Sequence, residues 1–188
     1  MDTEVVVRLL PAAERPAVAW KNGGGVTREI AGAPQGAGTA DFRWRVSLAE
    51  VAADGPFSAF PGVDRTLTMV EGDGMELTVD GAVTLVNAPY EPRDFAGDVP
   101  TGCRLLGAPV VNFNVMWRRD AVAAPPSVAV VRGRLPLTGP SLAVALTDEG
   151  AEVAGHRLGR YDAALVTGTG AAALHAQGQV AVVSGLVI

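Results

Sequence analysis

The sequence predicts an all-β protein made of many short strands. Of its 188 residues, 23 are glycine and 13 are proline, and helix interiors tolerate neither residue well. Apolar residues occur in short runs or alternate with polar ones, without the period of an amphipathic helix. Because 48% of the residues are hydrophobic, the chain is able to bury a substantial core.

The expected strands follow one another with turn residues between them. Residues 71–74 and the pair Asp80-Gly81 are typical of hairpin turns, whereas residues 54–65 and 87–102 are expected to be loops. Residues 121–127, which contain Pro125-Pro126, are expected to be a linker. Strands are expected at residues 5–10, 26–31, 41–49, 66–70, 75–79, 82–86 and 110–119 before this linker, and at residues 128–131, 142–146, 163–167, 171–176 and 180–188 after it.

Two of these strands, residues 41–49 and 110–119, each have one apolar and one polar face. Side chains alternate between the two faces of a sheet, so the polar residues of one strand lie together. Each polar face is either a solvated surface or the wall of a pocket. The polar faces carry Arg43, Arg45 and Ser47 on the first strand, and Asn112, Asn114, Met116 and Arg118 on the second.

A run of three glycines, Gly23 to Gly25, is the most unusual local feature. Lys21, the only lysine in the sequence, and Asn22 precede it, and Thr27 follows it. Successive N–H groups in such a turn can form a concave nest that binds an anion, and a compact ammonium group beside the nest would add positive charge. The other interpretation is a flexible surface loop between two strands, and the local sequence favours neither.

Composition excludes several classes of partner. The formal net charge is −5, and the sequence has no basic block, so nucleic acid is not expected as a partner. The apolar runs are too short to cross a bilayer, so no membrane is expected either. The single Cys103 cannot form an internal disulfide and Met1–Glu4 lacks a signal-peptide pattern, which predicts a cytoplasmic protein.

The residues that could do chemistry are mostly hydrogen-bond donors and amides. His156 and His175 are far apart in the sequence, and no spaced set of metal ligands is present, so no metal or other cofactor is expected. The polar residues of the first half include no histidine, which excludes a Ser-His-Asp triad there. Guanidinium groups bind carboxylates and amides bind amide or formyl groups, so this set predicts recognition rather than acid–base catalysis.

Five motifs, taken in order, resemble the HutD/Ves family. They are WKNGGGVTR at residues 20–28, WRVSLA at 44–49, GPFSAFPGVDR at 55–65, FAGD at 95–98 and NFNVMWRR at 112–119. Each motif alone is weak, but five in one order are specific. At one position this chain has Asn112 where the family usually has an aspartate, which puts in doubt the role of that acid and the identity of the ligand.

The resemblance implies a bicupin of the RmlC-like kind, with two antiparallel β-barrels fused in one chain. One barrel is expected at residues 1–124, with the ligand pocket, and a mainly structural one at residues 125–188. The resemblance also implies a non-catalytic regulatory protein of histidine or other amino-acid catabolism that binds N-formylglutamate or a similar small carboxylate. The oligomeric state is left open, with a homodimer as one option. The ligand-binding residues expected are Lys21, Asn22, Gly23, Gly24, Thr27, Arg45, Ser47, Ser58, Phe60, Arg65, Asn112, Asn114 and Met116.

Within this set, Lys21, Arg45 and Arg65 are expected to converge on one carboxylate as three cations. Two other functions stay open. The first is a metal-independent cupin enzyme, an isomerase or lyase, in which Lys21 is the base and is buried near Arg45 or Arg65. The second is a stress-related interaction protein whose groove binds no metabolite. A turnover screen separates the enzyme from the binding protein, and absence of ligand-induced stabilisation would favour the interaction protein.

Overall fold

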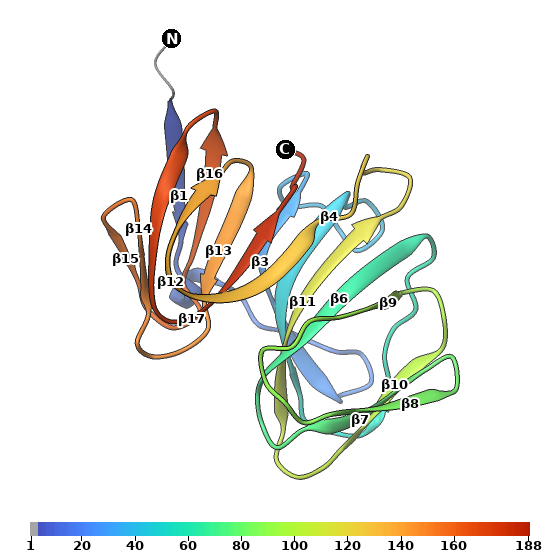
Figure 1. Ribbon diagram of the computed structural model, residues 1–188. Helices are drawn as coiled ribbons and strands as arrows, with labels where there is room; N and C mark the ends of the chain where they lie inside the picture. The colour runs from blue at the N-terminus through green and yellow to red at the C-terminus, as the bar shows by residue number, and fades with distance from the viewer. Residues whose placement is uncertain (1–3) are drawn as a thin grey trace. The chain divides into compact units, whose positions relative to one another are not determined.

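The computed structural model describes residues 4–188, and nearly all of its regular structure is β-strand (Figure 1). Among these residues the one exception is a single-turn 3-10 helix, η1 (Ala12–Glu14). The predicted all-β class is therefore confirmed. The chain forms two compact units: residues 16–123 make one, and the N-terminal segment up to Arg15 joins residues 124–188 in the other. No helix within residues 4–188 is long and apolar enough to cross a membrane.

The unit of residues 16–123 contains two antiparallel sheets. Six strands form the larger sheet in the order β2-β3-β4-β11-β6-β9, and four form the smaller one in the order β5-β10-β7-β8. The larger sheet consists of β2 (Val18–Ala19), β3 (Gly25–Ala33), β4 (Trp44–Val51), β11 (Val110–Arg118), β6 (Val63–Glu71) and β9 (Arg93–Ala96). The smaller sheet consists of β5 (Gly55–Pro56), β10 (Thr101–Leu105), β7 (Met75–Val79) and β8 (Ala82–Val86).

The two sheets of this unit share a buried apolar cluster. It joins Leu67 and Met69 on β6 to Met75 and Leu77 on β7. Side chains alternate along a strand, so Arg65 lies on the same face of β6 as Leu67 and Met69. On this face of β6, Leu67 and Met69 lie in the apolar cluster, and Arg65, two residues before Leu67, lies just beyond it.

The other unit is built on one sheet of seven strands. Six follow the order β1-β16-β13-β17-β14-β15, and β12 pairs with β17. Its buried cluster includes Ala143, Val166, Leu174 and Val180. The strands are β1 (Val5–Leu10), β16 (Ala163–Gly168), β13 (Ser141–Ala145), β17 (Ala171–Ser184), β14 (Ala151–Val153), β15 (His156–Leu158) and β12 (Ser127–Thr138).

The predicted division into residues 1–124 and 125–188 is wrong for the N-terminal strand. β1 pairs antiparallel with β16, from Val5 opposite Gly168 to Leu10 opposite Ala163. The Arg15 guanidinium then donates to the carbonyl oxygens of Leu10 and Tyr161 at 2.7 and 2.5 Å. The residues of a strand do not specify which distant strand it pairs with. The prediction therefore assigned β1 to the unit that follows it in the sequence, whereas β1 belongs to the unit of residues 124–188.

Several strands differ from those predicted. β9 and the start of β10 lie inside the expected loop at residues 87–102, and β14 and β15 were not predicted. The two strands expected at residues 171–176 and 180–188 are one strand, β17, which runs through Gly178. A Cβ atom at Gly178 would lie 1.9 Å from the Thr147 hydroxyl oxygen, so this glycine permits a close approach and does not end the strand.

Candidate functional site

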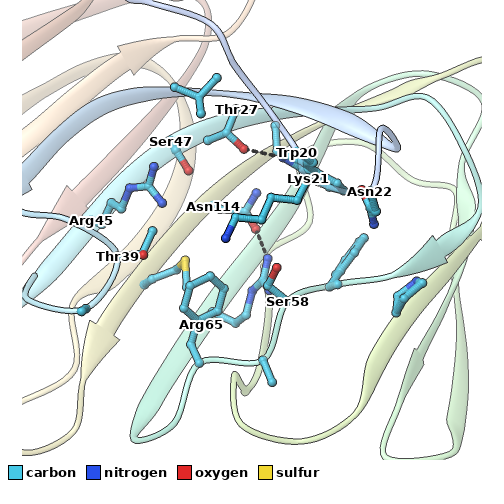
Figure 2. A pocket seen from close by; sticks show the side chains of 18 of the residues that line it. Trp20, Lys21, Asn22, Thr27, Thr39, Arg45, Ser47, Ser58, Arg65 and Asn114 are labelled. Atoms are coloured by element: carbon cyan, nitrogen blue, oxygen red, sulfur yellow. Dashed lines mark hydrogen bonds between the residues drawn. The ribbon is translucent and has the colours of Figure 1, made fainter.

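A cavity of about 800 Å³ opens in the unit of residues 16–123 (Figure 2). Its walls come from the β2–β3 hairpin, from β4, β6 and β11, and from the loop at residues 56–61. Gly23, Gly24 and Asn112 do not line it. The predicted binding residues that do line it are Lys21, Asn22, Thr27, Arg45, Ser47, Ser58, Phe60, Arg65, Asn114 and Met116.

The pleat of the larger sheet brings the polar side chains to one face. β11 lies between β4 and β6, and Met116 is opposite both Arg45 on β4 and Arg65 on β6. Asn114 is opposite Ser47 in the same way. Directly opposite residues in an antiparallel pair point to the same side of the sheet. These side chains therefore face the cavity together, and the two polar strand faces form a pocket wall.

Arg65 is the most constrained charge at the site. Its side chain is 7% exposed, and its Nη2 donates to Asn114 Oδ1 at 2.9 Å. The guanidinium carbon lies 5.4 Å from the ring centre of Phe57 and 5.1 Å from that of Phe95. Burial lowers the pKa of Arg65 to about 10, so the group remains cationic at neutral pH.

The charge on Arg65 has no counter-ion within residues 4–188. No carboxylate among them forms an ion pair with it, and its Nε is buried without a hydrogen-bond partner there. A buried charge is stable only when it is paired and hydrogen-bonded. The ring contacts and the Asn114 amide meet this need in part, and an anion in the cavity would supply the rest.

Lys21, Arg45 and Arg65 all line the cavity, as the predicted convergence requires, but Arg45 is already ion-paired. Its Nε donates to Glu29 Oε2 at 2.7 Å, so a carboxylate of this chain already balances its charge. A bulge in β3 between Glu29 and Ala31 shifts the register against β4, so that Ser47 lies opposite Glu29 and Arg45 opposite Gly32. The carboxylate then reaches diagonally to Arg45. The other three cations that line the cavity, Lys21, Arg65 and Arg118, have no ion-pair partner within residues 4–188.

Arg118 also lines the cavity and is held by other contacts. Its guanidinium carbon lies 5.3 Å from the ring centre of Phe42, and its Nη2 donates to the carbonyl oxygen of Ala40. These contacts fix the side chain against the wall. A carboxylate that approached Arg118 would therefore compete with a backbone carbonyl, which makes Arg65 the better anchor.

The glycine triplet forms a turn and not an anion nest. The N–H of Gly23 donates to the Trp20 carbonyl at 3.0 Å, and that of Gly24 donates to Asn22 Oδ1 at 3.0 Å. Both donors are therefore used inside the turn. Gly23 has a φ of +73°, which favours glycine, and a Cβ atom at Gly25 would lie 2.4 Å from the Glu50 carbonyl oxygen. The turn leaves Lys21 to extend into the cavity (Figure 2).

Three aromatic side chains that were not predicted as site residues lie in or behind the wall. Trp20 donates from its Nε1 to the Thr27 hydroxyl at 2.7 Å, and its ring meets Phe57 edge-on at 6.1 Å. Phe57 in turn contacts the Arg65 guanidinium, and so does Phe95, which the β6–β9 pairing brings beside Arg65. Trp20, Phe57 and Phe95 all lie inside the sequence motifs, but their neighbours in the sequence do not reveal these contacts.

Asn112 lies beyond the cavity, in the buried interior. It is 1% exposed, its Nδ2 is 4.0 Å from Met75 Sδ, and its Oδ1 has no partner within residues 4–188. The predicted pairing of Asn112 with the ligand therefore lacks a direct contact with the cavity. Asn112 lies on the same face of β11 as Asn114 and Met116, but strand alternation alone does not predict how far along the strand the cavity lining extends.

The lining offers donors rather than acid–base groups. None of the lining residues in the described chain is a histidine, a cysteine or a carboxylate. Within residues 4–188, no group of three or more His, Cys, Asp and Glu is placed to hold a metal ion, and His156 and His175 lie on β15 and β17 of the other unit. The arrangement suits anion binding, while the absence of a metal cofactor stays a prediction.

Comparison with known proteins gives relatives over most of the chain. The model of the HutD family matches residues 12–184. An uncharacterised 21.2 kDa protein from the hutC 3′ region of Pseudomonas putida is 40% identical over 111 residues, which are 59% of this chain and 58% of the relative. The protein Ves of Citrobacter koseri is 41% identical over 115 residues, which are 61% of this chain and 59% of the relative. The matched part is thus less than two thirds of the length of each curated relative.

Solved structures extend the similarity to the whole fold. HutD from Pseudomonas fluorescens SBW25, in a formate condition, aligns with a TM-score of 0.83 and 30% identity over 95% of this chain and 97% of that one. A cupin 2 conserved barrel domain protein from Leptotrichia buccalis aligns with a TM-score of 0.57 at 13% identity over 90% and 92% of the two chains. The latter likeness shows the fold alone. The predicted cupin-like all-β fold is confirmed, and the presence of two separate cupin barrels stays a prediction.

Proposed function

The chain belongs to the HutD family, and from this premise we propose that it is a non-catalytic binding protein for a small carboxylate metabolite. N-formylglutamate, or a close chemical relative, is the ligand that we assign to the cavity. We further propose that ligand occupancy regulates histidine catabolism. The gene position in the name of the Pseudomonas putida relative, the hutC 3′ region, supports the link to that pathway.

The observation that carries this proposal is the buried, uncompensated guanidinium of Arg65. It lies at a cavity, keeps its charge at neutral pH, and has no carboxylate partner within residues 4–188. Hydrogen bonds between ionised groups are about twice as strong as those between neutral groups. A ligand carboxylate would therefore gain more at Arg65 than a neutral ligand would.

The neighbouring groups favour a ligand with a second anionic group and a neutral polar group. Lys21 lines the cavity, is exposed, and forms no ion pair within residues 4–188, so it is available to a second carboxylate. Ser47 is on the same sheet face as Arg65 and Asn114, and its hydroxyl is suited to a formyl or amide oxygen. N-formylglutamate has two carboxylates and one formyl-amide group, which matches this set.

Calorimetric titration of the purified full chain tests the proposal. N-formylglutamate, glutamate, citrate and urocanate are titrated in turn, and N-formylglutamate is expected to bind with the highest affinity. At a hundredfold excess over its Kd, the ligand should stabilise the fold by ~2.7 kcal/mol, which raises the Tm by roughly 5–10 °C for a chain of this size. If none of the four carboxylates binds, the cavity is not a carboxylate site.

The same samples distinguish binding from catalysis. Proton NMR spectra of N-formylglutamate with substoichiometric protein are followed over hours, and the ligand should remain unchanged. Conversion of the ligand that is lost in Lys21→Met would instead support the metal-independent enzyme with Lys21 as base. Arg104→Met, which removes an exposed arginine paired with Glu76 outside the cavity, is the matched control for the loss of one cation.

A further inference from the structure

The cavity is larger than a glutamate-sized ligand requires. N-formylglutamate has about a dozen non-hydrogen atoms, and even at the ~30 Å³ that each water molecule occupies in the liquid it would fill only about 360 Å³. The cavity measures about 800 Å³, in the upper part of the range of roughly 300–1,000 Å³ that is usual for drug-sized ligands. More than half of the space is therefore left for another part of the ligand.

The inner and outer parts of the cavity differ in chemistry. The buried lining residues Arg65, Asn114 and Ser47 give the inner end its polar groups, beside the buried apolar Met116 and Ala49. Toward the solvent the lining contains exposed apolar side chains on two sides. Val18, which is 59% exposed, lies on β2, and Ala59 and Pro61 lie on the loop at residues 56–61. The rim also has polar residues, Lys21 among them, so an apolar group would lie beside charged and polar neighbours.

Half-buried aromatic rings connect the polar inner end with the apolar rim. Trp20, Phe57 and Phe60 all line the cavity and are neither buried nor fully exposed. The hydrogen bond from Trp20 to Thr27 and the edge-on contact of Trp20 with Phe57 fix two of these rings. Fixed rings form a preformed apolar wall, which reduces the entropy lost on binding.

We propose that the ligand class of this cavity is a carboxylate that carries an apolar substituent, namely an N-acylated acidic amino acid with an acyl group longer than formyl. The proposal rests on the carboxylate site proposed above. The carboxylate pairs with Arg65, and the acyl chain lies along Trp20 and Phe57 toward Val18 and Ala59. Burial of the acyl chain against these side chains adds affinity that N-formylglutamate does not obtain.

A chain-length series on the wild-type protein tests this inference. N-formyl-, N-acetyl-, N-butanoyl-, N-hexanoyl- and N-octanoylglutamate are titrated by calorimetry. Affinity should rise roughly two- to fourfold for each methylene that enters the cavity and level off once the cavity is full. If N-formylglutamate binds and affinity does not change along the series, the inference is wrong and the proposed function stands. If no member of the series binds, the proposed function is wrong as well.

Two variants and one ligand control locate the effect. Val18→Asn should flatten the increase with chain length and leave the affinity for N-formylglutamate within about twofold. Val83→Asn is the matched control, because Val83 is a similarly exposed valine on β8 that does not line the cavity. Octanamide, which lacks both carboxylates, should bind far more weakly than N-octanoylglutamate. Equal binding of octanamide, or an unchanged slope in Val18→Asn, would overturn the inference.

Discussion

Replacement of Arg65 by methionine should abolish ligand binding without unfolding the protein. Methionine keeps much of the apolar stem of the side chain and removes the charge. Burial lowers the pKa of Arg65 from its ordinary value to about 10, and at 1.36 kcal/mol per pKa unit the charged group costs the ligand-free protein about 3 kcal/mol. Arg65→Met removes this cost.

Two losses oppose that gain. The guanidinium contacts with Phe57 and Phe95 contribute together about 1–3 kcal/mol. The hydrogen bond to Asn114 is also lost, and an unpaired buried amide oxygen costs about 1–3 kcal/mol. Set against the gain of about 3 kcal/mol, losses of about 2–6 kcal/mol should leave the free energy of unfolding between about 1 kcal/mol higher and about 3 kcal/mol lower than in the wild type. If Arg65 were instead one member of a buried ion pair, its removal would lower the free energy of unfolding by about 3–5 kcal/mol.

Urea denaturation and calorimetric titration measure the two effects separately. The affinity of Arg65→Met for N-formylglutamate should fall at least about 30-fold, because loss of one partner of a buried charge pair costs roughly 2–5 kcal/mol of binding free energy. Arg104→Met is the control, since that arginine is exposed and ion-paired outside the cavity, and neither quantity should change. A loss of more than about 3 kcal/mol of unfolding free energy in ligand-free Arg65→Met would show that Arg65 is structural, and retention of binding would show that it is not the anchor.

Three further predictions concern the charge, the turn and the pH. Lys21→Met should weaken binding of N-formylglutamate by roughly two- to fivefold and that of a monocarboxylate such as acetate by less, as measured by titration; equal effects would exclude Lys21 from the second carboxylate. Gly25→Ala should lower the unfolding free energy by about 2–4 kcal/mol, because its Cβ would lie 2.4 Å from a backbone oxygen, whereas Gly38→Ala, where nothing lies within 4 Å, should have little effect in urea denaturation. The folded-state pKa of Arg65 is below its ordinary value, so the destabilisation by its charge is complete below about pH 10 and is lost as the pH rises toward the ordinary pKa of arginine. The stability of wild type relative to Arg65→Met should therefore increase by about 1 kcal/mol from pH 9 to pH 11, and a constant difference would contradict the assigned burial cost.

The polar wall of the cavity could be predicted because it depends on local alternation. Residues 41–49 and 110–119 alternate apolar and polar side chains, and the pleat alone places Arg45, Ser47, Asn114 and Met116 on one face. Arg65 was a candidate for another reason: it ends the expected loop at residues 54–65, and the structure places it within β6 instead. Properties that follow from the side-chain period of a single strand were therefore recovered from the sequence.

Features that depend on pairing between strands could not be recovered. The Glu29–Arg45 ion pair follows from a bulge in β3 that shifts the register by one residue, and no residue of Arg45's own strand signals it. Phe95 reaches Arg65 only because β9, in an expected loop, pairs with β6. The partner of β1 is more than 150 residues away along the chain. Such non-local pairings depend on the global topology.

A crystal structure of the protein with N-formylglutamate tests the central claim most directly. The account predicts one ligand in the cavity of residues 16–123, with a carboxylate oxygen within about 3 Å of an Arg65 guanidinium nitrogen. The Arg65–Asn114 hydrogen bond and the Arg45–Glu29 ion pair should both remain, because neither group needs to move for the ligand to enter. A ligand bound with its carboxylates away from Arg65, or an empty cavity in a crystal whose protein binds the ligand in solution, would contradict the account.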